Sequence, residues 1–178
     1  MRTFLKLAVT VVLAAQTAAC GYTLAGRGSF LPAYIKTVGI PEFANSTPYY
    51  EVEQLFTDKI RSELIGRGKY QVLPQATGVD ALLKGGITSM TIRPASFNQQ
   101  QQATRFVITI TTSIELVDLK TNKTIWQNPS MMFREEYDLP ADLQAGDPSA
   151  FFGQSSNALQ RVASDFARTV ISSILEAF

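Results

Sequence analysis

Residues 104–118, TRFVITITTSIELVD, decide the fold of this chain. Two kinds of side chain alternate along the stretch. The first set is mostly large and apolar: Phe106, Ile108, Ile110, Thr112, Ile114 and Leu116. The second set is smaller and more polar: Val107, Thr109, Thr111, Ser113 and Glu115. A period of two residues is typical of a β-strand with one buried face, and the β-branched content favours a strand. The pattern predicts a long antiparallel strand.

More strands flank this one. Residues 118–123 (DLKTNK) read as a turn, after which residues 124–137 return as a second long strand. On the other side, residues 81–92 alternate in part, with Ala81, Leu83, Gly85 and Ile87 on one face. The pair Gly85-Gly86 indicates a bulge or a close backbone approach. The centre of the chain is therefore predicted to be a run of strands.

Helical patterns lie before and after these strands. Residues 36–43 predict a first strand, and residues 69–73 predict a short one. Between them, Thr47 and Pro48 predict a helix N-cap and the first helical position. The first helical stripe comprises Val52, Leu55, Phe56, Ile60 and Leu64, and it ends at Gly66 and Gly68. Asp147-Pro148 repeats the start signal, and a second stripe runs to the C-terminus, with Gly153 and the pair Ser155-Ser156 delaying or kinking its start. That stripe comprises Phe152, Leu159, Val162, Phe166, Val170 and Ile174.

The order of these elements predicts the fold class. A strand and a helix are followed by a run of strands and then by a helix. This order favours an α+β domain: a two-layer sandwich in which two helices pack on one face of a mixed β-sheet. The predicted single domain covers residues 36–178.

The N-terminus predicts export. Arg2 and Lys6 precede an apolar run at residues 7–15, and small residues lead to Cys20, the only cysteine in 178 residues. This arrangement is typical of a signal peptide over residues 1–19. It also resembles a bacterial lipobox, although Thr17 stands where leucine is usual. The lipobox reading predicts that Cys20 is acylated and that residues 20–35 form a tether; the alternative is an ordinary secretory signal that leaves a free thiol. Gly21, where inner-membrane lipoproteins often have aspartate, favours the outer membrane.

Composition excludes several kinds of chemistry. The chain has no histidine and one cysteine, so histidine-dependent triads and zinc sites lack their residues. We expect no cofactor and no metal. Loss of the leader leaves 14 basic and 15 acidic residues, so we expect no binding to nucleic acid. Glu135, Glu136 and Asp138 could support glycoside hydrolysis, but a solvated strand end is the favoured interpretation, because neighbours on a strand point to opposite faces.

Residues 97–106, FNQQQQATRF, form the most unusual local feature. Four consecutive glutamines predict a loop at a hairpin tip, with Arg93 before it and Arg105 after it. Arginine binds phosphate in bidentate fashion, and Asn98, Gln99 and Gln100 add uncharged donors and acceptors. The alternative is a solvated turn with incidental arginines. Lys84 and Arg134 are candidates for the same face, and the polar face of residues 107–113 could meet water, a ligand or another protein.

The mature chain resembles a known family over essentially its whole length, and the resemblance is most specific in its first third. The residues that carry the resemblance are Cys20-Gly21-Tyr22, Leu24, Gly26, Leu31-Pro32, Ile35-Lys36, the helix expected from Pro48, the segment DALLKGGI from Asp80, the strand TRFVITI and the segment IWQNP at residues 125–129. Together they resemble the LptE-type lipopolysaccharide-assembly lipoproteins of the outer membrane.

The resemblance implies a non-enzymatic role. LptE-type proteins plug the lumen of the barrel protein LptD, aid its assembly and bind lipopolysaccharide. They are held at the outer membrane by a lipid anchor that faces the periplasm. One feature departs from the better-known enterobacterial members, because Asn98 follows Phe97 where they carry a basic residue. Two alternatives stay open: a generic lipoprotein scaffold of another envelope complex, and a carboxylate-dependent glycan hydrolase.

Overall fold

The computed structural model describes residues 31–101, 103–138 and 156–177. The predicted signal peptide, Cys20, most of the tether and the Asp147-Pro148 helix start lie outside these residues. Leu31 and Ile35, at the end of the predicted tether, are buried in the core. No helix in the described ranges is both long and apolar enough to cross a bilayer.

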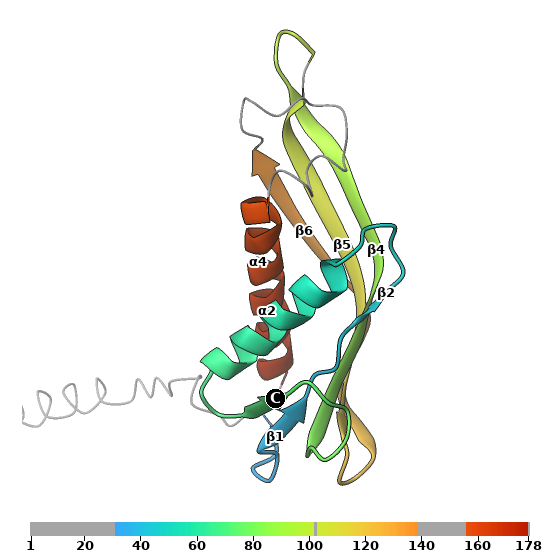
Figure 1. Cartoon of the computed structure of the whole chain (residues 1–178), viewed down its shortest axis with the longest axis vertical. Coiled ribbons are helices and arrows are strands. Elements are labelled where there is room, and N and C mark those ends of the chain that lie inside the picture. The colour runs from blue at the N-terminus through green and yellow to red at the C-terminus, as the bar shows by residue number, and fades with distance from the viewer. Residues whose placement is uncertain (1–30, 102, 139–155, 178) are drawn as a thin grey trace, which may run out of the picture.

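A mixed sheet forms one layer of the molecule (Figure 1). Its strands are β1 (Thr37–Gly39), β2 (Ala44–Asn45), β3 (Gln71–Leu73), β4 (Ala81–Phe97), β5 (Ala103–Asp118) and β6 (Lys123–Asp138). The spatial order is β3-β1-β4-β5-β6, and β2 pairs with β4. Strand β1 runs parallel to β3 and β4, whereas β4, β5 and β6 are antiparallel. The predicted mixed sheet is confirmed.

Strand β5 lies between β4 and β6 and has the two-sided pattern that residues 104–118 predict. The alternate residues Ile108, Ile110, Thr112, Ile114 and Leu116 are all buried. Their neighbours Val107, Thr109, Thr111 and Ser113 lie on the opposite face and are partly or fully exposed. The sheet therefore has one face in the core and one open face that no described helix covers.

Two helices, α2 (Val52–Gly66) and α4 (Ser156–Leu175), cover the core face. Phe56 of α2 and Phe166 of α4 meet edge to face, with ring centroids 5.1 Å apart. Phe133 of β6 meets Phe166 at 5.8 Å. Both predicted stripes are confirmed within the described residues, and Phe166 joins the two helices to the sheet. The predicted α+β two-layer sandwich is the observed architecture.

The predicted start of the first helix is wrong. The helix begins at Val52, after Glu51 in a left-handed conformation with φ 65° and no side-chain cap. The residues that resemble a cap form a turn instead, because Asn45 Oδ1 accepts hydrogen bonds from the backbone N–H and the hydroxyl of Thr47. Asn45 Nδ2 in turn donates to Glu53 Oε2 at 2.6 Å. An Asx-type turn and an N-cap use the same residue types, so this sequence is compatible with either structure.

The predicted first strand over residues 36–43 is also too long. Strand β1 stops at Gly39, and the chain reaches β2 only at Ala44. Pro41 has no N–H to donate to a ladder. The N–H of Phe43 bonds instead to Thr57 Oγ1 at 3.0 Å, so this stretch is fixed to helix α2.

Gly85 allows this path. A Cβ atom at Gly85 would lie 2.5 Å from the ring of Phe43, inside van der Waals contact. The predicted close approach is therefore confirmed, and a register shift follows between Ile87 and Ser89. Strand β4 then continues to Phe97, five residues beyond the predicted end at 92.

Candidate functional site

The long hairpin of β4 and β5 extends past the end of helix α4, and its tip is far from β1 (Figure 1). The tip is an ordered turn. Asn98 Oδ1 accepts the N–H of Gln100 at 3.0 Å, and the N–H of Gln101 donates to Asn98 O at 3.1 Å. Gln101 adopts a left-handed φ of 60°. Gln99, Gln100 and Gln101 thus lie at a hairpin tip, where Gln99 and Gln100 are exposed and Asn98 is partly buried.

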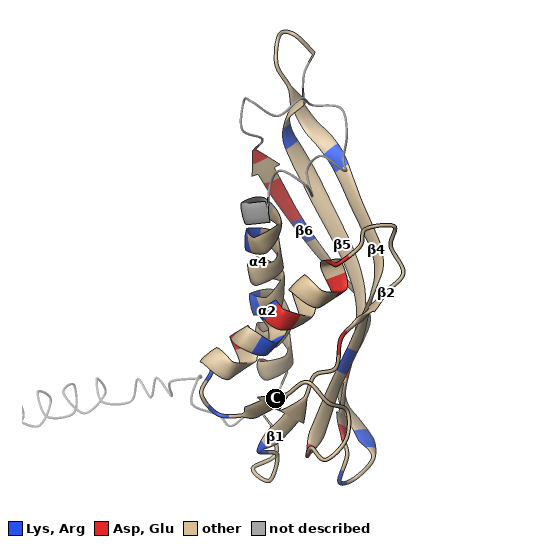
Figure 2. Ribbon diagram, viewed as in Figure 1, with Lys and Arg blue, Asp and Glu red and all other residues tan. Residues whose placement is uncertain are grey.

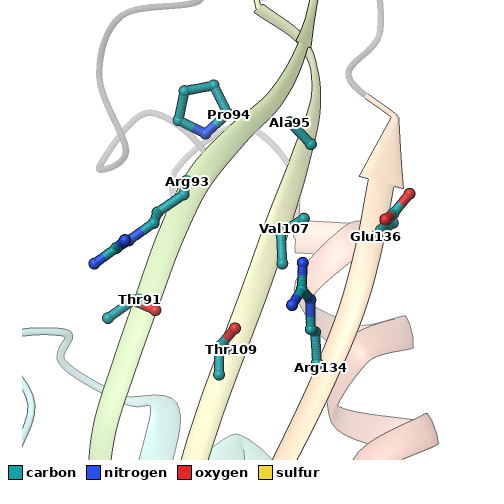
Figure 3. Close-up of a pocket in the computed structure, with 8 residues that line it drawn as sticks. All are labelled: Thr91, Arg93, Pro94, Ala95, Val107, Thr109, Arg134 and Glu136. Carbon is teal, nitrogen blue, oxygen red and sulfur yellow. The ribbon is translucent and has the colours of Figure 1, made fainter.

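A shallow groove of about 490 Å³ lies on the open sheet face below this tip (Figure 3). Its lining is Thr91, Arg93, Pro94, Ala95, Val107, Thr109, Arg134 and Glu136. Strand register explains why these residues meet. One row across the sheet is Arg93, Val107 and Glu136, and the next is Thr91, Thr109 and Arg134. The groove therefore has one arginine on each side of β5.

Arg105, predicted to act together with Arg93, has other partners. Its Nε donates to Asp138 Oδ1 at 2.7 Å, and its Nη1 lies 3.6 Å from Glu136 Oε2. The hydrogen bond and charge of Asp138 raise the pKa of Arg105 above its ordinary value. Its guanidinium is thus already engaged by carboxylates. The residues that line the groove do not include it.

Arg93 and Arg134 differ from Arg105. Both side chains are exposed, and neither forms a hydrogen bond or ion pair with any residue the structure describes. Lys84 lies on the same face but pairs with Glu115, at 3.0 Å, outside the groove. The structure therefore places Arg93 and Arg134 along the same groove and leaves Lys84 and Arg105 in separate ion pairs.

The three carboxylates near the end of β6 do not face a common cleft. Glu135 pairs in register with buried Ile108 and so lies on the helix side of the sheet. Glu136 and Asp138 lie on the open side and share Arg105. Among residues 31–101, 103–138 and 156–177, no group of three acidic or metal-binding side chains could hold an ion.

A second polar cluster lies at the opposite end of the sheet and escaped the sequence prediction. Asp80 Oδ2 accepts the N–H groups of Lys36 and Thr37, each at 2.9 Å. Asp80 Oδ1 pairs with Lys120 Nζ at 3.1 Å. Because these bonds join β1, β4 and the turn between β5 and β6, the cluster holds the sheet together. The signal available in the sequence is only a set of turn-type residues, whose partners depend on register.

Asp118 belongs to the same end of the molecule. It is buried, and it accepts hydrogen bonds from the Tyr34 hydroxyl and from Thr121 Oγ1. The Tyr34 hydrogen bond lowers the pKa of Asp118, and the bond from Thr121 adds to the effect. The two carboxylates are fully satisfied, which fits a structural role rather than a reactive one.

Comparison with solved structures identifies proteins of the same fold. Uncharacterized lipoprotein B from Nitrosomonas europaea matches with a TM-score of 0.50 and 12% identity, covering 84% of this chain and 87% of its own. A hypothetical protein from Chlamydia trachomatis matches with a TM-score of 0.53 and 10% identity, covering 79% and 96%. At such identities the likeness concerns the fold alone. Comparison with curated protein sequences finds no match.

Comparison with protein families is more specific. The model of the LptE family, described as lipopolysaccharide-assembly, matches residues 35–174. The match begins just before β1 and ends one residue before the end of α4, so it includes the sheet, both helices and the groove. The chain therefore belongs to the LptE family of lipopolysaccharide-assembly proteins.

Proposed function

We propose that this protein is a non-enzymatic outer-membrane lipoprotein that occupies the lumen of an LptD-type β-barrel. It helps that barrel to assemble and binds lipopolysaccharide on its way to the outer leaflet. The observation that carries the proposal is the family match over residues 35–174, since it covers the whole folded unit rather than one motif.

The open sheet face is consistent with a place inside a larger protein. Thr109, Thr111 and Ser113 give it a mildly polar surface, and Met132 is 66% exposed beside them. The lumen of an outer-membrane barrel is itself polar. Charged residues lie scattered over both layers in Figure 2, and the near-neutral net charge suits close packing against such a wall.

The carboxylate geometry supports the non-enzymatic reading over a glycan hydrolase. Glycoside hydrolysis needs two carboxyl groups that flank one bond, one of them able to donate a proton. Here Glu135 and Glu136 lie on opposite faces of β6, and Arg105 binds both Glu136 and Asp138. Glu135 and Glu136 therefore cannot flank one bond, and Arg105 engages the two carboxylates that do share a face.

The membrane anchor is part of the proposal. Residues 1–19 act as a lipoprotein signal peptide, Cys20 becomes the acylated first residue, and residues 20–35 tether the domain to the outer membrane from the periplasmic side. Stable attachment requires more than one acyl chain, because a single myristoyl chain gives an association constant of only about 10⁴ M⁻¹.

Depletion in the bacterium that makes this protein tests the proposal. The amount of lipopolysaccharide in the outer leaflet and the amount of folded LptD-type barrel should both fall as the protein is lost. Re-supply of the wild-type chain should restore both. If lipopolysaccharide delivery and barrel levels stay unchanged while another envelope complex fails, the scaffold alternative replaces this function.

The anchor is tested by the intact mass of the purified protein. The wild-type chain should begin at Cys20 and carry the added mass of acyl chains. The Cys20→Ser variant, which keeps the size of the side chain but removes the thiol, should lack that mass. A variant that still carries lipid would disprove the assignment of Cys20.

A further inference from the structure

We infer that Tyr50, on the loop between β2 and α2, is an anchor residue for a protein partner, and that the partner presents a lysine or arginine to the Tyr50 ring and to Glu51. The partner is the inner wall of the LptD-type barrel, and in this respect the inference rests on the proposed function. Three observations carry it: the exposure of the ring, the rigidity of its loop and the unpaired carboxylate beside it.

The first observation is the exposure of Tyr50. Among the large apolar side chains in the described ranges, Tyr50 is the most exposed, at 91%, and Met132 follows at 66%. Its neighbour Tyr49 packs against the core instead. An exposed ring adds nothing to the folding of the domain, but it contributes strongly once a partner removes it from water. Tyrosine is one of the residue types that dominate the binding energy at protein interfaces.

The second observation is that hydrogen bonds fix the loop. The Ser46 N–H donates to Ile87 O of β4 at 2.9 Å. Asn45 Oδ1 accepts the N–H and the hydroxyl of Thr47, and Asn45 Nδ2 donates to Tyr49 O at 2.7 Å. Tyr50 is therefore presented by a backbone that is already ordered. A pre-organised contact loses less conformational entropy on binding than a loose one does.

The third observation concerns Glu51, the residue after Tyr50. Its backbone is left-handed, with φ 65°, a conformation that is unfavourable for a residue with a Cβ atom. Its exposed carboxylate does not cap helix α2 and makes no hydrogen bond or ion pair with a described residue. Strained residues are found at sites that bind or react. Here the strained turn leaves a carboxylate unpaired next to the exposed ring.

The chemistry of the two side chains indicates what they meet. The face of a tyrosine ring attracts a cation, and so does a free carboxylate. Residues 41–51 contain Glu42 and Glu51 but no lysine or arginine, so this segment supplies no cation of its own. In Figure 1 the loop stands out beside β4, at the margin of the sheet, where a wall around the domain would meet it. The lumen of an outer-membrane barrel is polar, and a basic stretch of that wall fits Tyr50 and Glu51.

Competition between two full-length lipoproteins in one cell tests the anchor. Wild-type and variant chains carry different C-terminal tags, and their ratio on the purified barrel is divided by their ratio in the outer membrane. Tyr50→Ala should be under-represented on the barrel about tenfold, as truncation of an anchoring aromatic residue implies. Tyr50→Phe keeps the ring and should compete almost as well as the wild type. Equal representation of Tyr50→Ala and wild type would overturn the inference and leave the proposed function in place.

Ile65 provides the matched control. It lies near the C-terminal end of α2 and is 55% exposed, so Ile65→Ala also removes exposed apolar surface. This variant should compete like the wild type. An equal loss in Ile65→Ala and Tyr50→Ala would overturn a specific anchor in favour of a general effect of the apolar surface. The thermal unfolding midpoint of Tyr50→Ala should match that of the wild type, which separates lost binding from misfolding.

The charge of Glu51 supplies a second, independent readout. Glu51→Gln should lower representation on the barrel, and Glu51→Lys should lower it several-fold further, because a like charge then faces the partner's cation. Glu176→Lys makes the same change at an exposed glutamate near the C-terminus and should compete like the wild type. Undiminished representation of Glu51→Lys would overturn the partner's cation. A purified barrel that carries neither chain would contradict the proposed function and this partner together.

Discussion

Asp80 joins β1 to the start of β4 and to the turn between β5 and β6. Its carboxylate accepts the N–H groups of Lys36 and Thr37 and pairs with Lys120. These bonds, the two backbone N–H groups foremost, hold the pKa of Asp80 well below its usual range. A carboxyl group with a lowered pKa in the folded state contributes stability above its unfolded pKa of about 4, and that contribution disappears as pH falls toward the folded pKa.

We therefore expect Asp80→Asn to change how stability depends on pH. The wild-type chain should lose free energy of unfolding as pH falls below about 5. The variant should be less stable at pH 7 and should lose less on acidification, because it carries no group to protonate at this position. Urea unfolding followed by circular dichroism from pH 7 to pH 3 measures both quantities.

Asp118 serves as the comparison within the same cluster. The Tyr34 hydroxyl lowers its pKa too, so part of the acid sensitivity should remain in Asp80→Asn and diminish further in a variant that also carries Asp118→Asn. If the free energy of unfolding of Asp80→Asn falls with pH as steeply as that of the wild type, the Asp80 hydrogen bonds do not contribute to stability.

At the same scale, the arginines show the limit of sequence reasoning. The stretch from Arg93 to Arg105 is recognisable as a cationic hairpin from residue types alone. Which arginine keeps an unpaired charge depends on cross-strand partners, and the register that brings Asp138 to Arg105 cannot be derived from local pattern. Arg134 is recognisable only as a candidate, because its place beside Thr109 depends on the same register.

At the scale of elements, the sequence pattern predicts the features that depend only on residues close together in the chain. Strand β5 alternates over its whole length, so its two faces could be assigned before its partners were known. The start of α2 could not be predicted in this way. Asn45 and Thr47 form a hydrogen-bonded turn with each other, and the helix begins only after Glu51. Pro41 and the contact of Phe43 with Gly85 likewise divide a predicted strand for tertiary reasons.

Phe166 tests how the elements are joined. It is fully buried and meets Phe56 of α2 and Phe133 of β6. Phe166→Ala should lower the free energy of unfolding by about 3–5 kcal/mol, through lost burial and a cavity between the layers. Phe166→Leu keeps most of the apolar volume and should cost clearly less. Equal, small losses of under about 1 kcal/mol in both variants, measured by urea unfolding, would contradict the packing described.

At the scale of the whole molecule, the two faces of the sheet have different surroundings. Helices α2 and α4 close the core on one face, while the other face of β4, β5 and β6 stays open around the groove. The α+β class and the family could be predicted from the sequence, because element order and the N-terminal residues carry them. The groove could not, since it exists only where residues from three strands align.

The central claim is that this protein works inside a lipopolysaccharide translocon. The most direct measurement is purification of the acylated, C-terminally tagged protein from outer membranes in mild detergent, followed by identification of the proteins that accompany it. A large LptD-type β-barrel should co-purify with the wild-type chain in about equal amount, and an unrelated tagged outer-membrane lipoprotein should not retain it. Purification without any large β-barrel would contradict the account.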